Sequence, residues 1–346
     1  MRKLFLLLLI PVAAFWGCAD TSLVQLGPDV KSNLAPLTVI SPLAPNKPEL
    51  DFTAGDKAWF TAKFSRNESW HLRLLGNVSL AEFTIDGKGT EIAAWNSTWD
   101  GSTTKFPVFQ SSEQVLAFVS FDDTSLILST TVFLKKARTP DLTNAVLLSD
   151  FEGTNLPAFP RLIQADDSVN FGQSNEVRAA QGSFYYSLTG VEAPYRKDYF
   201  IGYVQFPASL KGQNTTHYNL IDRADSVWFN VFVYGAGRAN TQLAIQFQED
   251  DVFPFEGTYD SDIEDQSAYN LQVTWTGWKL VSFRYSETLY GDNQRGAGKN
   301  GNRVHEPNKI SNVQFSLITN PPGHAAGQAV ASIDFPVFTI GAPFRP

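Results

Sequence analysis

Uncharged hydrogen-bonding side chains and aromatic rings gather on one face of three apolar segments in the second half of the chain. The segments are 226–234, 242–248 and 312–318. Alternate residues of a strand point to opposite faces of its sheet, so each segment has one purely apolar face that belongs to a core. The opposite face mixes amides with rings, and its candidate ligand-binding residues are Trp228, Asn230, Tyr234, Gln246, Gln248 and Gln314.

A face of this mixed kind suits a sugar, whereas a face meant only for water would carry Lys, Glu and Thr. A flat ring stacks on the C–H face of a sugar, while Asn and Gln both donate to and accept from hydroxyl groups. We therefore predict a ligand-binding face with Arg284 and Tyr234 at its rim. The alternative is that a long loop, 250–275 or 286–308, covers the rings, which then form a second small core.

The sequence offers little that could carry catalysis. Its four histidines stand far apart and lack the spacing of metal ligands. It also lacks the Gly-x-Ser-x-Gly elbow that presents a nucleophilic serine. Two carboxylates could still converge in space to hydrolyse a glycosidic bond, and Glu249 is the acid nearest to the mixed face. We predict that the protein is not an enzyme, with a glycoside hydrolase as the less favoured alternative.

Composition favours an all-β protein and excludes some partners. The 346 residues include 27 Phe, 11 Tyr and 8 Trp against a single Met, and 24 Gly and 19 Pro supply turns. A hydrophobic content of 43% is enough for packed cores. The net charge of −8, without a block of Lys and Arg, argues against nucleic-acid binding. The single cysteine excludes a disulfide framework and a cysteine-rich metal site.

That cysteine, Cys18, stands shortly after an apolar run, behind Trp16 and Gly17. Arg2 and Lys3 precede the run 4–15, which is shorter than the roughly 20 apolar residues of a membrane span. The pattern resembles the signal of bacterial lipoproteins, in which a small residue precedes the acylated cysteine. The resemblance implies a signal peptide over 1–17, lipidation of Cys18 and anchoring in the cell envelope, with the outer membrane of a Gram-negative bacterium as the expected site. The alternative is an ordinary secretion signal with an incidental cysteine.

The sequence pattern in the first half of the mature chain predicts a tether followed by a small β-sandwich. Residues 18–50 are polar and rich in proline, which is typical of a tether. Over 51–138, short alternating runs are broken by turn residues about every ten positions, as in a β-sandwich. The segment 95–101 ends in Trp-Asp-Gly and resembles the corresponding turn of bacterial immunoglobulin-like modules. The resemblance implies an immunoglobulin-like β-sandwich.

The module 145–346 contains an ordered set of short strand patterns. They are Asp-Phe-Glu-Gly at 150–153, a central aromatic strand at 227–235, Gly-Trp-Lys at 277–279 and a closing Ile-Asp at 333–334. Together they resemble the galactose-binding-like jelly roll of carbohydrate-binding modules. The resemblance implies a larger β jelly roll that follows the first sandwich, so that the expected fold is all-β throughout.

The same resemblance implies a metal site. In the resembled family the first and last strands lie close together, and an acidic residue from each commonly holds a structural calcium. Asp150, Glu152 and Asp334 occupy these strands here. Calcium takes six to eight oxygen ligands, which carboxylates and backbone carbonyls supply. The alternative is that these carboxylates only accept hydrogen bonds from backbone N–H groups.

These observations predict an envelope lipoprotein that binds a polysaccharide or other glycan without catalysis, through its C-terminal jelly roll. Its membrane contact would be the lipid anchor. The alternative is a structural or adhesion lipoprotein that binds another envelope protein, since such architectures serve both purposes. A groove lined by aromatic rings and amides favours a sugar, and a flat apolar patch favours a protein partner.

Overall fold

The computed structural model describes most of the chain beyond the N-terminal segment. The described residues are 35–122, 124–154, 156, 158–163, 168–191, 199–211, 216–249, 265–290, 302–319 and 327–346. By its contacts the chain divides into two units, 1–38 and 39–346, and the architecture below is that of the second unit. The predicted signal peptide and Cys18 lie outside the described residues. In the described part of the chain, no helix is long and apolar enough to cross a membrane.

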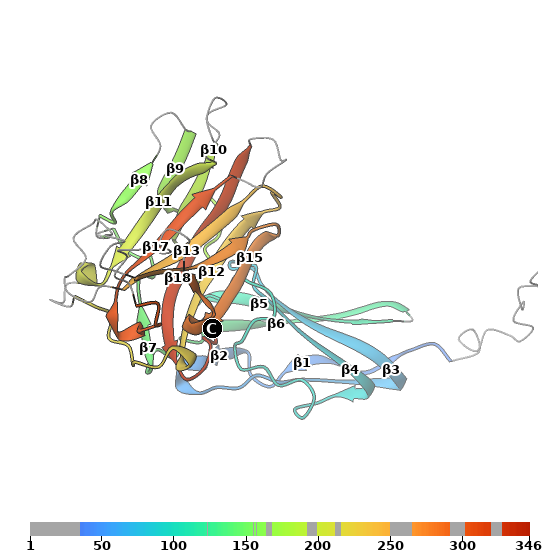
Figure 1. Ribbon diagram of the computed structural model, residues 1–346. Helices are drawn as coiled ribbons and strands as arrows, with labels where there is room; N and C mark the ends of the chain where they lie inside the picture. Colours follow the sequence, from blue (N-terminus) through green and yellow to red (C-terminus); the bar gives the residue numbers. More distant parts are fainter. Residues whose placement is uncertain are drawn as a thin grey trace, which may run out of the picture. The chain divides into compact units, whose positions relative to one another are not determined.

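The first module is a single six-stranded sheet with the strand order β1-β3-β5-β6-β2, in which β4 also pairs with β3. The long strand β3 has two neighbours on one edge: its first residues pair with β1 and its last residues pair with β5. On its other edge, β3 pairs with β4. Figure 1 shows β3 and β4 as one long hairpin, with β5 and β6 beside it. The strands are β1 (Val39–Pro45), β2 (Glu49–Asp51), β3 (Phe60–Gly76), β4 (Glu82–Ile92), β5 (Glu113–Phe121) and β6 (Thr124–Lys136).

Strands β1 and β2 correct the predicted tether. β1 and the first two residues of β2 lie within 18–50, yet β1 pairs antiparallel with β3, and β2 pairs parallel with β6. The prolines favour a tether, but β1 pairs on one side only and its register shifts between Ser41 and Ala44. An edge strand with such an irregularity tolerates Pro42, because proline removes only a donor that the sheet does not use.

The predicted Trp-Asp-Gly turn is present and closes the core of the first module. Trp99 is fully buried, and its indole N–H donates to the carbonyl of Ser102 at 2.8 Å. Gly101 has a φ of +87°, and a Cβ at that position would lie 2.7 Å from the ring of Phe52. Glycine is therefore required both by the backbone conformation and by the close approach of the ring.

The second module is a sandwich of two six-stranded sheets, which confirms the predicted all-β class and β-sandwich. One sheet has the order β15-β12-β18-β10-β9 with β7 added to β18, and the other has the order β16-β14-β13-β17-β11-β8. The strands are β7 (Ala145–Leu147), β8 (Arg161–Ile163), β9 (Ser168–Ser174), β10 (Tyr185–Val191), β11 (Phe200–Pro207), β12 (Val227–Ala236), β13 (Gln242–Glu249), β14 (Asp265–Gln272), β15 (Thr276–Arg284), β16 (Leu289–Tyr290), β17 (Ile310–Ile318) and β18 (Gln328–Ile340).

Helical structure among the described residues is limited to single 3-10 turns. They are η2 (Phe52–Ala54), η3 (Ala208–Lys211), η4 (Ala224–Ser226), η5 (Tyr285–Glu287) and η7 (Pro307–Lys309). The core of the sandwich is built from the apolar rows of its strands, as the period-two pattern requires. Phe229 of β12, Phe247 of β13 and Phe315 of β17 meet there, with ring centroids 5.1 and 6.1 Å from Phe229.

The two modules contact each other through the segment that follows the Trp-Asp-Gly turn. Phe106 packs edge-on against Phe232 of β12, with ring centroids 4.9 Å apart. The backbone N–H of Val108 donates to the carbonyl of Ala180 at 2.9 Å.

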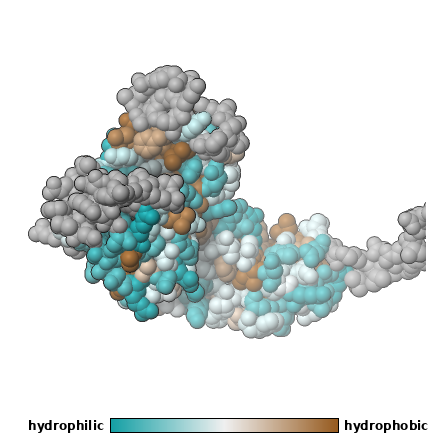
Figure 2. Space-filling view, viewed as in Figure 1, coloured by the Kyte–Doolittle hydropathy of each residue, from teal (hydrophilic) through white to brown (hydrophobic). Residues whose placement is uncertain are grey.

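The surface in the view of Figure 2 is mostly hydrophilic, and its brown, apolar patches are small and separate.

Candidate functional site

The seven predicted ligand-binding residues lie on two different sheets of the jelly roll. Three of them lie on β12 and Arg284 lies opposite Trp228 on β15, in the sheet that contains β18. Gln246, Gln248 and Gln314 lie on β13 and β17 of the other sheet. The outer faces of a two-layer sandwich point in opposite directions. The prediction that all seven form one surface is therefore wrong, because a strand pattern shows the face of a residue but not its sheet.

Asn230 does not face a ligand. Its side chain is fully buried, and its Nδ2 donates to Thr339 Oγ1 at 3.0 Å and to the carbonyl of Val337 at 3.3 Å. Its Oδ1 accepts from the backbone N–H of Phe344 at 3.0 Å. Asn230 thus fixes the C-terminal segment against the sheet, which is a structural role.

The aromatic residues of this face form the second small core that was the alternative prediction. Phe232 is fully buried beneath Phe106 and Phe344. Tyr234 packs against Trp278 at 5.3 Å. Among the described residues, the cover of Phe232 comes from the first module and the C-terminal segment. The predicted covering loops, 250–275 and 286–308, lie in part outside the described residues. Trp228 is half-buried, and the guanidinium of Arg284 lies over its ring at 4.9 Å.

The outer face of the other sheet carries a continuous ladder of amides across three strands. Gln205 of β11 donates through Nε2 to Gln314 Oε1 at 2.9 Å, and Gln314 Nε2 donates to Gln246 Oε1 at 2.6 Å. Ser316 Oγ also donates to Gln246 Oε1, at 2.8 Å. Gln205, Gln314 and Gln246 are direct cross-strand neighbours. We call Gln205, Gln314, Ser316 and Gln246 the amide ladder.

The members of the amide ladder differ in their exposure. Gln205 and Gln314 are only 3% and 8% exposed. Gln246 at the end of the ladder is half-buried, and no described residue accepts a hydrogen bond from its Nε2. Gln248 is 2% exposed, and Asn312 Nδ2 donates to its Oε1 at 2.7 Å. Among the predicted amides, Gln246 is therefore the one best placed to meet a ligand.

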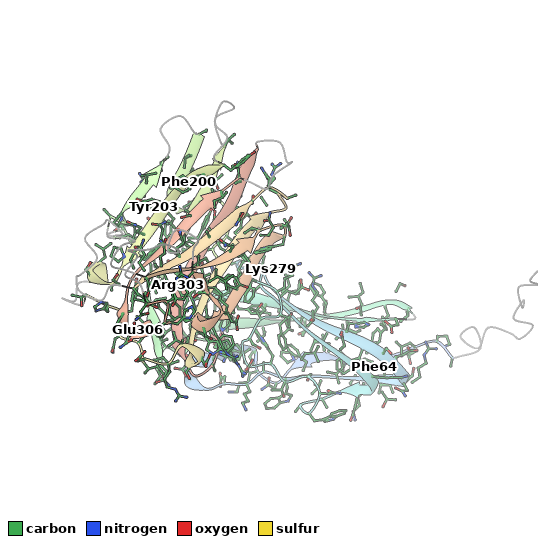
Figure 3. All side chains as sticks on the ribbon, viewed as in Figure 1. Phe64, Phe200, Tyr203, Lys279, Arg303 and Glu306 are labelled. Atoms are coloured by element: carbon green, nitrogen blue, oxygen red, sulfur yellow. The ribbon has the colours of Figure 1, made fainter. Side chains whose placement is uncertain are left out.

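Two aromatic residues border the amide ladder. Tyr203 of β11 lies directly across from Ser316, and it is half-buried. Its ring centroid is 6.3 Å from that of Phe200 (Figure 3). Sequence reasoning missed Tyr203, Phe200, Gln205 and Ser316. The same alternation that singled out 226–234 runs through 200–207, where Tyr203 and Gln205 alternate with the core residues Val204 and Phe206.

A buried acidic group lies at the far end of β13. Glu249 is 2% exposed, and its Oε1 accepts from Tyr285 Oη at 2.5 Å and from the N–H of Glu306 at 2.9 Å. Burial, with a smaller contribution from the neighbouring carboxylate of Asp265, raises the pKa of Glu249 to about 7. The hydrogen bonds oppose this shift. A carboxyl group held in this way is not open to a glycosidic bond, which weighs against Glu249 as a hydrolytic acid.

The predicted calcium ligands come together only in part. Glu152 Oε1 accepts from the N–H groups of Ser183 and Phe184 at 2.7 and 2.9 Å. Asp334 Oδ2 accepts from the N–H of Gln181 at 2.8 Å. Both carboxylates therefore hold the same segment, whereas the exposed Asp150 accepts from the N–H of Glu152 within its own turn. Within the described ranges, no three His, Cys, Asp or Glu side chains are arranged to hold a metal ion.

Two features at these carboxylates still suit a cation. Asp334 is fully buried, and no described residue donates a hydrogen bond to its Oδ1. Burial raises the pKa of Asp334 well above its usual value, and the nearby Glu152 adds to the effect. The residues beside the two acids, Phe151 and Phe335, have φ values of +55° and +50°. Aromatic residues rarely adopt this left-handed conformation, and such strain often marks a functional site.

No protein-family model and no curated protein matches the chain, but solved structures with a similar arrangement exist. One is a family 11 carbohydrate-binding module from Clostridium thermocellum in complex with a β-1,3-1,4-mixed-linked tetrasaccharide, with 13% identity and a TM-score of 0.38 over 57% of this chain and 96% of that one. A family 30 carbohydrate-binding module of a C. thermocellum cellulosomal cellulase has 13% identity and a TM-score of 0.33. The match covers 57% of this chain and 97% of that one. SGBP-B from a complex xyloglucan utilization locus of Bacteroides uniformis has 12% identity and a TM-score of 0.34. The match covers 88% of this chain and 72% of that one.

Proposed function

We propose that this protein binds an uncharged glycan, without catalysis, through the outer face of the sheet that carries the amide ladder. The observation that carries the proposal is the ladder itself, which runs from Gln205 to Gln246 beside the rings of Tyr203 and Phe200. This is the combination that the sequence predicted for a sugar-binding face, but it lies on the sheet opposite Trp228.

The ladder orients the groups that would meet the glycan. The Oε1 of Gln246 accepts from both Gln314 and Ser316, so its amide is held with Nε2 available as a donor. The half-buried ring of Tyr203 can stack on a sugar, and its hydroxyl can donate and accept. Because only a few protein groups would contact the glycan, a single site should bind it with a Kd of about millimolar to micromolar.

Isothermal titration of the full chain tests this site. The first probes are the mixed-linked β-1,3-1,4 tetrasaccharide and xyloglucan, which similar structures name, followed by a wider glycan panel. Tyr203→Ala and Gln246→Ala should each lower the affinity about tenfold or more, since each removes a stacking ring or a donor. Trp228→Ala is the matched control, because it lies on the opposite sheet and should leave the affinity unchanged.

Two results would contradict the proposal. One is the absence of binding to every glycan of the panel with calcium present. The other is loss of binding in Trp228→Ala with full binding in Tyr203→Ala, which would move the site to the other sheet.

We also propose that the protein is anchored in the cell envelope by acylation of Cys18, at the outer membrane of a Gram-negative bacterium. Support comes from the sequence alone, where the only cysteine follows the apolar run 4–15. Several acyl chains on one residue give stable anchoring, whereas a single chain is marginal. Wild-type protein made in a Gram-negative host should incorporate labelled palmitate and fractionate with membranes. Cys18→Ser should lose both properties, and a soluble, unlabelled wild-type protein would refute the anchor.

The third part of the proposal is a structural calcium held by Glu152 and Asp334. The buried Oδ1 of Asp334, to which no described residue donates a hydrogen bond, supports it, as does the strained backbone beside both acids. A bound cation would keep Asp334 ionised and would fix the segment 180–184 through the two carboxylates. Asp150 is not part of this proposal, because its carboxylate closes its own turn.

A further inference from the structure

The most exposed large apolar side chain among the described residues is an indole on the first module. Trp95 is 76% exposed, and it belongs to the loop between β4 and Trp99. Trp99, four positions on, is fully buried. The segment 95–101 thus places one tryptophan in the core and turns the other outward, and the amide ladder does not account for the second one.

The loop that carries Trp95 is held by hydrogen bonds on both sides. The N–H of Ala93 donates to Asn96 Oδ1 at 2.7 Å, and Ser97 Oγ donates to the carbonyl of Ala93 at the same distance. Thr98 Oγ1 donates to the carbonyl of Ala94 at 2.6 Å. A ring presented on such a preformed loop can bind a ligand with little cost in chain ordering.

The surroundings of the ring point to a sugar rather than to a protein or a lipid surface. In the fully described segment 91–102, Trp95 is the only exposed large apolar side chain. The core of a protein interface needs several such residues in one patch. Beside the loop, Lys63 pairs with Glu91 at 3.9 Å, and the chain carries a net charge of −8, which disfavours attraction to an anionic lipid surface. One flat ring with polar neighbours matches a single pyranose.

We propose that Trp95 is a second glycan-binding site, where the indole stacks on one sugar ring of a polysaccharide. The inference rests on the proposed function for the nature of the ligand, but it uses no residue of the amide ladder. A long polysaccharide could engage both sites of one protein, which would raise its overall affinity above that of a short fragment.

The test is ¹⁹F NMR of the full chain labelled with 5-fluorotryptophan. The resonance that disappears in Trp95→Phe belongs to Trp95. Polymeric mixed-linked β-glucan and polymeric xyloglucan should shift or broaden it, and they should still do so in Tyr203→Ala. Trp95→Ala should lower the affinity for at least one polymer about fivefold or more while the affinity for the tetrasaccharide stays the same. Ile127→Ala is the matched control, because it removes a 63% exposed apolar side chain from the same module.

The outcomes separate the two proposals. If the Trp95 resonance stays unchanged with both polymers while Tyr203→Ala loses binding, the second site is refuted and the amide ladder stands. If the resonance shifts and Tyr203→Ala binds like wild type, Trp95 stands and the amide-ladder proposal is refuted. If no glycan of the panel, in polymeric or short form, binds at all with calcium present, both are refuted. Partitioning of Trp95 into anionic vesicles, without any response to polymer, would also overturn the inference.

Discussion

Gln314 donates an N–H to the Oε1 of Gln246 at 2.6 Å, although 68 residues separate the two along the chain. They are direct neighbours across β17 and β13, and Gln205 of β11 donates to Gln314 from the other side. An amide has both a donor and an acceptor, so a row of amides can satisfy its inner members while an end group stays available. Gln314 is thus the central member on which the positions of the outer members depend.

Replacing this central amide should cost stability. Gln314→Leu would leave Gln205 Nε2 without its acceptor and would remove one of the two donors to Gln246 Oε1, the other being Ser316. Unmade hydrogen bonds of little-exposed groups cost about 1–3 kcal/mol. The free energy of unfolding in urea should fall by about that amount. Gln242→Leu changes a half-buried glutamine of β13 outside the ladder, and should have little effect. Equal stability of Gln314→Leu and wild type would show that the ladder does not contribute to the fold.

The imidazole of His71 links three segments of the first module and should make its stability depend on pH. Its Nε2 lies 2.8 Å from Asp122 Oδ1 and its Nδ1 lies 2.7 Å from Asp86 Oδ1. The hydrogen bonds to Asp122 and then Asp86 raise the pKa of His71. The folded state therefore binds the proton more tightly than the unfolded state does. This contribution to stability is complete below the unfolded pKa of about 6.5 and is lost as the pH rises through the folded value.

Urea denaturation of wild type and His71→Gln between pH 5 and pH 9 measures this effect. The difference in stability between the two proteins should be largest at pH 5 and should shrink toward pH 9. A difference that does not change with pH would mean that protonated His71 is not held by the two aspartates. Asp86→Asn should reduce the pH-dependent part without removing it, because Asp122 remains.

Glu249 should also make stability depend on pH, over a different range. Its folded pKa of about 7, raised by burial, lies above the value of an exposed glutamate. Tyr285, Asp265, Glu306 and Tyr290 face it, and the charged form gains no counter-charge from them. The stabilisation is complete below about pH 4.3 and is lost as the pH rises through 7. By pH 8 the loss amounts to about 3–4 kcal/mol, because each unit of pKa difference corresponds to about 1.4 kcal/mol.

Glu249→Gln tests this prediction, since glutamine imitates the protonated acid and keeps the acceptor for Tyr285. At pH 8 the variant should be more stable than wild type in urea denaturation, and near pH 4 the two should be similar. Tyr285→Phe serves as the comparison that removes the hydrogen bond but keeps the acid. A variant that is less stable than wild type at every pH would contradict the assignment of a buried, protonated Glu249.

Calcium should stabilise the jelly roll if Glu152 and Asp334 hold it. A ligand present at about 100 times its Kd adds about 2.7 kcal/mol to the free energy of unfolding. Thermal unfolding of protein freed of metal by a chelator should shift upward when millimolar calcium is added. Asp334→Asn should abolish the shift, while Asp150→Asn should keep it. An equal midpoint with calcium and with chelator would refute the metal site.

The sequence alone determined the class of fold and the faces of the strands. Val227, Phe229 and Val231 had to point into a core because they alternate with polar and aromatic positions, and the structure buries all three. The same rule identified Gln246 and Gln314 as outward-facing. Local chemistry likewise predicted the turn at Trp99 and Gly101, since it depends on residues that are neighbours in the chain.

Only the tertiary structure decided which faces share a surface and what covers them. Trp228 and Gln246 have the same strand pattern, but long-range pairing put them on opposite sheets. Phe232 is buried because Phe106 of another module packs on it. A period of two residues records the alternation of one strand, whereas cover and neighbourhood depend on contacts between distant segments, which no local pattern encodes.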